Sequence, residues 1–265
     1  MIFCCFISVS EIILRYKIPI VLSILLICTN VFAQEDIDVD KERSPAITFG
    51  SEIDFPSQYV WHGLLWSNGF VMQPTLWTTT YGFTFSAFSN FDLDHQAFKS
   101  TYNESDLIIA YRKEWKKIIF EPDFQYYLYP NQKNVPSTGE GVLKFSYPIG
   151  DMQIFTIHTF DLVRYRGAYF GELGLMRTLE FNSNLALELA VFSGWASAKF
   201  NEVYVGLHRN AFNVVEGELS LLYYPQKYLY FKPHLRISYI VNEILHEYIV
   251  DSSPISFGVS IGTEF

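Results

Sequence analysis

The sequence predicts an all-β fold: a transmembrane antiparallel β-barrel of about twelve strands, with about fourteen as the alternative. Apolar and polar residues alternate with period two over stretches of roughly ten residues, the pattern of strands with one face in lipid. Phe (24) and Tyr (18) are abundant, and aromatic side chains favour pleated surfaces. After residue 33 no apolar run reaches the roughly eighteen residues that a membrane helix needs, so strands are expected to cross the membrane.

The N-terminal segment predicts export through a cleaved signal peptide. Arg15 and Lys17 precede an apolar run over residues 18–28, and Val31-Phe32-Ala33 forms an A-x-A-like cleavage site. The run is short for a membrane anchor, which is the alternative, and an acidic stretch follows it at once. We expect a signal peptide over 1–33, an N-terminal periplasmic segment over 34–45 and an outer-membrane β-barrel over 46–265, in a Gram-negative bacterium.

Charge and cysteine content narrow the function classes. The formal net charge is −9, and removal of the signal segment, whose own net charge is +1, leaves −10. Nucleic acid is therefore not an expected partner, because its binding relies on basic surface. The three cysteines, Cys4, Cys5 and Cys28, all lie in the signal segment. An exported chain without disulfides needs another source of stability, which closing a large hydrogen-bonded sheet would supply.

The first five expected strands are separated by turn residues and polar loops. They cover 47–61, 70–81, 83–91, 107–112 and 117–129. The tetrapeptide WSNG (66–69) and the pair Tyr81-Gly82 are expected to be tight turns, whereas DHQAFKSTYNES is a polar loop. In the third strand, Phe83 and Phe85 fall on one face and Thr84 on the other.

The remaining seven strands are expected over 143–147, 151–162, 168–179, 185–191, 213–224, 228–240 and 255–265. PNQKNVPSTGEG is the polar loop before them, and PIGD, FNSN and PQK are tight turns. The stretch 195–212 decides the strand count. If it is an outer segment, PQK turns on the periplasmic side and VNEILHEYIVDSS forms an outer loop. The even count of twelve then agrees with the short periplasmic turns of bacterial barrels.

The chain ends on an alternating strand, ISFGVSIGTEF. Phe257, Val259 and Ile261 fall on one face, and small residues such as Gly258 fall on the other. In a closed barrel the last strand pairs with the first, so the chain can stop at the rim. A terminal aromatic residue on such a strand is similar to the sorting signal of outer-membrane proteins. We therefore expect the barrel-assembly machinery to recognise the strand that ends in Phe265.

The stretch 51–93 carries a family resemblance. Its matching residues are Ser57-Gln58-Tyr59-Val60-Trp61-His62-Gly63, Gln73-Pro74, Tyr81-Gly82 and Asn90-Phe91-Asp92. They resemble the opening of the TorF-type group of outer-membrane porins, whose members share a Ser-Asp-Tyr-Val-aromatic-Arg-Gly motif, a short polar turn and a Gln-Pro or Gln-Gly strand. Gln58 stands at the acidic position of that motif, and His62 stands at the basic one. The resemblance implies an outer-membrane barrel and gives little about the solute.

The strand faces that turn away from lipid are expected to line the lumen. On 228–240 they form a basic ladder of Lys232, His234 and Arg236, and the neighbouring strand presents Glu216 and Glu218 to the same side. Opposite charges on facing strands attract. The other expected pore-lining residues are Arg112, Glu121, Asp123, Glu172 and Glu188.

Two interpretations of these charges remain open. Facing rows of opposite charge can create a transverse field in a channel, or they can pair and fill a lumen narrower than that of 16- to 18-stranded porins. We expect a channel for small polar solutes in contact with outer-membrane lipid. A non-conducting structural or adhesion barrel is the first alternative, and a membrane-embedded lipid hydrolase is the second. The six histidines stand outside any nucleophile motif, and no enzymatic activity, metal site or cofactor is expected.

Overall fold

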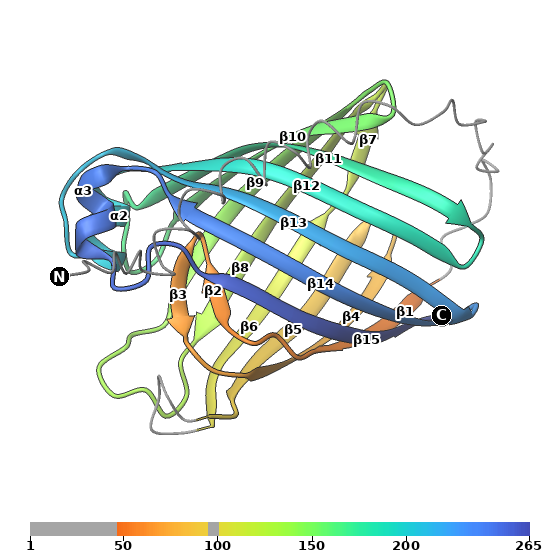
Figure 1. The fold of residues 1–265 in the computed structure, drawn as a ribbon, viewed down its shortest axis with the longest axis horizontal. Helices are drawn as coiled ribbons and strands as arrows, with labels where there is room; N and C mark the ends of the chain where they lie inside the picture. Colours follow the sequence, from red (N-terminus) through yellow and green to blue (C-terminus); the bar gives the residue numbers. More distant parts are fainter. Residues whose placement is uncertain (1–46, 95–100) are drawn as a thin grey trace, which may run out of the picture. The chain divides into compact units, whose positions relative to one another are not determined.

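The chain forms a closed antiparallel β-barrel (Figure 1). The computed structural model describes residues 47–94 and 101–265, so the expected signal peptide (1–33) and periplasmic segment (34–45) lie outside the described residues. Twelve strands form the wall, which confirms the predicted fold and strand count. They are β1 (Thr48–Asp54), β4 (Val71–Thr80), β5 (Phe83–Asp92), β6 (Tyr102–Tyr111), β8 (Ile118–Leu128), β9 (Thr138–Ile149), β10 (Met152–Asp161), β11 (Tyr169–Asn182), β12 (Leu185–Ala196), β13 (Ala211–Gln226), β14 (Leu229–Ile240) and β15 (Ile255–Glu264). A short strand, β7 (Lys113–Trp115), pairs with the beginning of β8.

The barrel closes by pairing the first strand with the last. β1 pairs with β4 on one side and with β15 on the other. At the end of this seam the backbone N–H of Phe49 donates to the carbonyl of Phe265 (2.9 Å), and the N–H of Phe265 donates to the carbonyl of Phe49 (3.0 Å). The β6–β8 pairing completes the ring. Each wall strand therefore has a neighbour on both sides, which satisfies its backbone groups in hydrocarbon.

Most of the stretch 195–212 connects two wall strands and adds no strand of its own, as the twelve-strand interpretation requires. β12 ends at Ala196, and a helix, α2 (Ala198–Tyr204), precedes β13. Ser197 caps this helix, because its Oγ accepts a hydrogen bond from the N–H of Phe200 (3.2 Å). A second helix, α3 (Glu243–Tyr248), lies between β14 and β15. Both helices lie at one end of the barrel, called here the loop end, and the C terminus lies at the other, the turn end (Figure 1).

The predicted first strand is wrong in its second half. We expected it to continue to Trp61, but the wall strand β1 stops at Asp54. Pro56 has no N–H to continue a ladder, and the chain then forms a separate hairpin of β2 (Tyr59–Trp61) and β3 (Leu64–Ser67). Its two-residue turn is His62-Gly63, with φ values of 50° and 77°. Positive φ at both positions is the signature of a type I′ turn, the turn that suits a tight hairpin.

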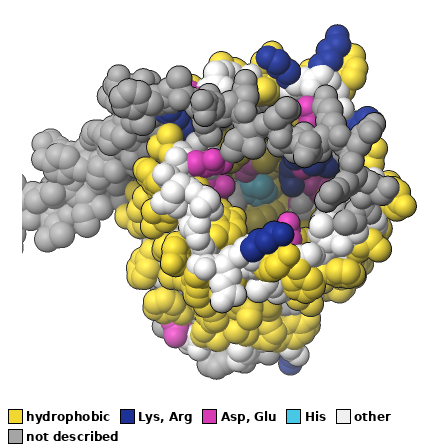
Figure 2. Space-filling model, turned by 90° about the vertical axis from the view of Figure 1, so that its right-hand side faces the viewer, with side chains coloured by type: hydrophobic (Ala, Val, Ile, Leu, Met, Phe, Trp, Pro, Cys, Tyr) yellow, Lys and Arg dark blue, Asp and Glu magenta, His cyan; other side chains and the backbone are white. Residues whose placement is uncertain are grey.

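The two faces of the wall differ in polarity. Figure 2, which views the turn end, shows yellow hydrophobic side chains around the outside and charged side chains inside a hollow mouth. Exposed large hydrophobic residues on the outer face include Leu76, Phe85, Leu107, Leu173 and Phe257, each 47% to 61% exposed. Within 47–94 and 101–265 the structure has no helix long and apolar enough to span a membrane. The strands carry the apolar surface instead.

A hydrophobic core lies inside the loop end. It joins Leu64 of the hairpin, Phe200 of α2 and Leu245 of α3 to inward-facing wall residues such as Val214. Trp61 of the hairpin stacks on Phe200, with ring centroids 5.7 Å apart. The hairpin and the two helices therefore pack on one another within this mouth of the barrel, while polar side chains line the lumen next to them.

Candidate functional site

The basic ladder of β14 faces the lumen, and each of its members forms an ion pair with a carboxylate side chain. Lys232 Nζ lies 2.9 Å from Glu52 Oε2. His234 Nε2 lies 2.8 Å from Asp54 Oδ1, which also accepts a hydrogen bond from Ser260 Oγ (2.9 Å). Glu52 and Asp54 belong to β1, two strands away from β14, and sequence reasoning did not single them out. Two rungs of the ladder therefore pair across the barrel seam.

Arg236 is the rung that pairs as predicted. It forms an ion pair with Glu218, which lies directly opposite it on β13. Its Nη1 also donates a hydrogen bond to the carbonyl oxygen of Val60 in the hairpin (3.0 Å). The charged rows of β13 and β14 therefore attract one another at this rung, and the same guanidinium holds the hairpin.

Small residues on β15 explain why the other two rungs reach β1. β15 lies between β14 and β1, with Gly258 opposite His234 and Ser260 opposite Lys232. The ring of His234 covers Gly258 so closely that a Cβ there would lie 2.7 Å from its Nε2. The alternation of small residues in the last strand therefore leaves room for side chains from β14 to pass over it.

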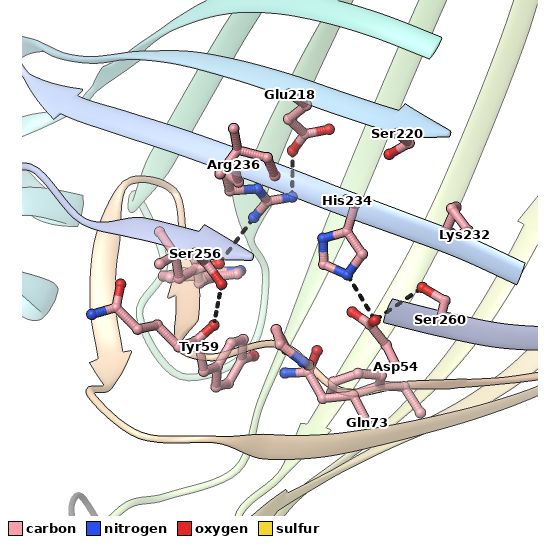
Figure 3. A pocket seen from close by; sticks show the side chains of 16 residues that line it. Asp54, Tyr59, Gln73, Glu218, Ser220, Lys232, His234, Arg236, Ser256 and Ser260 are labelled. Carbon is pink, nitrogen blue, oxygen red and sulfur yellow. Dashed lines mark hydrogen bonds and ion pairs between the residues drawn. The ribbon is translucent and has the colours of Figure 1, made fainter. Parts of the chain in front are cut away.

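A polar cavity of about 350 Å³ lies between the ladder and the hairpin. Figure 3 shows Lys232, His234 and Arg236 on one side of it, with Tyr59 and Gln73 on the other. Further lining residues are Asp54, Glu218, Ser220, Ser256 and Ser260. The surface offers both signs of charge together with hydroxyl and amide groups, which suits a small polar solute.

The hairpin of β2 and β3 crosses the lumen and docks on the opposite wall. At its base, Ser256 Oγ on β15 donates to the carbonyl oxygen of Gln58 (3.0 Å). At its tip, His62 Nδ1 lies 3.2 Å from Glu172 Oε1 on β11. The same imidazole lies over Phe170, with ring centroids 4.0 Å apart. The hairpin therefore narrows the barrel from the loop end.

The other predicted pore-lining residues are spread along the lumen. Glu216 is buried and accepts a hydrogen bond from Ser238 Oγ (2.7 Å). Arg112 and Glu121 form an ion pair (2.9 Å) at the turn end, and Asp123 pairs with Lys144 (3.0 Å). Glu188 points to the same side as Ser220, which lies opposite it on β13. The structure thus joins Glu218 to the ladder and leaves Arg112, Glu121 and Asp123 in separate pairs.

Sequence reasoning missed an acidic wall on the far side of the lumen. Its members come from β6, β9 and β10 and are at most 6% exposed: Glu104, Asp106, Glu140 and Asp161. Tyr127 donates a hydrogen bond to Glu140 (2.8 Å), and Thr138 donates one to Asp161 (2.5 Å). Asp161 lies within the strand predicted over 151–162 but was not singled out, whereas the other three would have required strands that begin at residues 102 and 138.

Burial determines the protonation state of Tyr204 at the loop end. Tyr204 of α2 contacts Trp61, and burial together with nearby carboxylates raises the pKa of its hydroxyl far above the usual value. The hydroxyl of Tyr204 therefore stays protonated across the physiological pH range.

Within the described part of the chain, no three His, Asp or Glu side chains converge closely enough to hold a metal ion.

Comparison with solved structures finds the same barrel fold in several outer-membrane porins. No protein-family model and no curated protein matches the sequence. A solved KdgM porin aligns with a TM-score of 0.52 and 10% identity over 82% of this chain and 99% of its own. A NanC porin gives 0.52 and 13% over 80% and 98%. The COG4313 outer membrane channel from Pseudomonas putida F1 gives 0.52 and 9% over 88% and 100%.

These likenesses concern the fold. At such low identities they establish a closed antiparallel barrel of the kind that those porins have, over nearly the whole length of each. Residue roles in this chain have to be argued from its own lumen.

Proposed function

We propose that the chain is an outer-membrane channel for small polar solutes, whose inward hairpin sets the narrowest part. The observation that carries this proposal is the polar cavity of about 350 Å³ inside a barrel with an apolar outer face. Hydrophobic side chains on the outside stabilise the wall in lipid, whereas paired charges and hydroxyl groups inside stabilise water and solute.

The proposed location is the outer membrane of a Gram-negative bacterium, reached through a cleaved signal peptide. Short links at the turn end and longer ones at the loop end support an orientation with the loop end outside. The resemblance to the TorF-type group supports membership in that family. The residues that carry it, Ser57 to Gly63, lead into the hairpin and form β2 and its turn, so the motif would encode the constriction.

Single-channel recording in planar bilayers tests the proposal. The wild-type protein should give discrete conductance steps. A variant in which residues 59–67 are replaced by a short Gly-Ser linker should give larger steps, because the hairpin no longer occupies the lumen. Larger steps would also place the constriction in the hairpin rather than in the wall.

The core at the loop end favours a second candidate, a non-conducting barrel. Leu64, Phe200 and Leu245 are at most 7% exposed and leave little room for water in that mouth. The absence of conductance in both wild-type protein and the hairpin variant would favour this candidate.

A channel catalyses no reaction, so the purified protein should release no fatty acid from phospholipid vesicles.

A further inference from the structure

A polar cluster lies on the lipid-facing side of the wall near the loop end. His158 of β10 lies opposite Leu143, an outward-facing residue, and therefore shares its face. Its Nδ1 lies 2.9 Å from the hydroxyl of Tyr169, and Trp195 Nε1 donates to the same hydroxyl (3.1 Å). Thr156 Oγ1 lies 3.2 Å from His158 Nε2. Linked polar groups on a surface that meets acyl chains call for a polar neighbour in the membrane interface.

Two surface grooves meet at Tyr169. The first, of about 390 Å³, is lined by the apolar side chains of Phe160 and Leu162 and also by Arg166. The second, of about 430 Å³, lies between Trp195 and Phe212. Phe160, Leu162 and Phe212 are 40% to 50% exposed, as residues that contact acyl chains would be.

The rim above these grooves is basic. Arg164, Arg166 and Arg209 are exposed, and none forms an ion pair with a carboxylate in the described ranges. Arg166 uses only its Nε, which donates to the carbonyl oxygen of Leu162 (3.0 Å). Its outer nitrogens can therefore bind an anion in the interface.

Nearby carboxylates are already occupied. Asp161 lines the first groove, but its Oδ1 accepts hydrogen bonds from the backbone of Val163 (3.0 Å) and Tyr165 (2.7 Å). Glu202 on α2 lies 3.1 Å from both Lys199 and His208, and their hydrogen bonds lower the pKa of this carboxyl group. Among the described residues, the arginines of this part of the rim therefore have no carboxylate partner.

We propose that this rim of β10–β13 binds a phosphorylated glycolipid of the outer leaflet. Acyl chains lie in the two grooves, Arg166 and Arg209 bind phosphate groups, and the hydroxyl of Tyr169 hydrogen-bonds to the sugar backbone. The inference rests on the proposed outer-membrane location. Charge complementarity selects the occupant, because a neutral lipid would leave the arginines without a partner.

Native mass spectrometry of the detergent-purified protein, titrated with lipid A, tests this site. The double variant Arg166→Glu/Arg209→Glu should bind lipid A at least about 25-fold more weakly, from about fivefold for each arginine lost. Lys113→Glu/Lys117→Glu makes the same charge change on exposed residues at the turn end and should bind as the wild type does. Tyr169→Phe keeps the ring and should weaken binding by a smaller factor.

Three results would overturn the inference: equal binding by both double variants, equal binding of dephosphorylated lipid A, or full competition by inorganic phosphate. The first two would indicate only the general lipid shell of a barrel, and the third would indicate a site for free anions. Conductance recorded on the same preparations separates this inference from the proposed function. A conducting protein without a lipid A site contradicts the inference alone, whereas a lipid A site in a protein that never conducts contradicts only the channel.

Discussion

Arg236 Nη1 donates a 3.0 Å hydrogen bond to the carbonyl oxygen of Val60, which ties wall strand β14 to the hairpin inside the lumen. The same side chain pairs with Glu218, and both side chains are about one-third exposed to the lumen. An ion pair in such wet surroundings contributes less than about 1 kcal/mol. The contact therefore positions the hairpin more than it stabilises the barrel.

Replacing Arg236 should loosen the constriction. In Arg236→Gln we expect more frequent or larger conductance steps, because the hairpin loses a charged anchor near its base. Lys232→Gln is the matched control, since Lys232 loses the same charge but contacts Glu52 of the wall instead of the hairpin. Identical recordings from the two variants would remove Arg236 from the account of the constriction.

Gly63 should be the most sensitive position of the hairpin turn. A Cβ at Gly63 would lie 2.5 Å from Val214 Cγ2 of the wall, and φ is +77° there. Gly63→Ala should therefore displace the tip and raise conductance, in addition to about 1–2 kcal/mol of backbone strain. Gly150→Ala isolates the strain, because Gly150 has φ +62° with nothing within 4 Å of its Cβ position. It should lower the free energy of unfolding in urea and leave conductance unchanged.

The two sides of the lumen should have opposite effects on ion selectivity. The members of the ladder already have carboxylate partners, whereas the four carboxyl groups of the acidic wall form no ion pair within the described residues, so we expect a preference for cations. Reversal potentials in a KCl gradient should move toward stronger cation preference in Lys232→Glu and toward weaker preference in Glu140→Gln. Shifts in the same direction, or none, would show that permeating ions avoid these residues.

Phe265 should matter for assembly more than for stability. Its side chain is 65% exposed, so the folded barrel gains little from it. We expect Phe265→Ala to reduce the amount of protein that reaches the outer membrane, with little change in unfolding of the purified barrel. Phe257→Ala, also on β15 and 57% exposed, should reduce that amount less. Equal effects would argue against recognition of the terminal aromatic residue.

The predicted processing site can be checked directly. N-terminal sequencing of protein from outer-membrane fractions should begin at Gln34. A mature protein that still begins at Met1 would support the anchor instead of the cleaved signal.

Alternation predicted the strands of the wall where large apolar residues mark the outer face. It was less informative in the halves of the strands near the loop end, and for this reason Glu104 and Glu140 were assigned to loops. Near Glu140 the outward positions are Gly139 and Gly141, and the side chains of Phe124 and Leu162 cover them from neighbouring segments. Because neighbouring segments supply the apolar surface at these positions, the sequence of this strand shows no apolar–polar alternation.

The hairpin was missed for a different reason. We expected a wall strand up to Trp61 and a tight turn at 66–69, so the turn at His62-Gly63 was missed. Only tertiary packing distinguishes an inward hairpin from a longer wall strand. The partners of the hairpin, such as Glu172 and Phe170, lie far away in the sequence. The ladder lies on the predicted strand, but the pairing of Lys232 with Glu52 and of His234 with Asp54 depends on closure of the barrel, which places β1 beside β15.

The anchors of the hairpin have a consequence for biogenesis. The hairpin precedes eleven of the twelve wall strands in the sequence, yet Arg236 and Ser256, which hold its base, belong to β14 and β15. The hairpin can therefore reach its final position only after β14 and β15 have joined the sheet. We therefore expect the lumen to reach its final width only in the last step of barrel assembly.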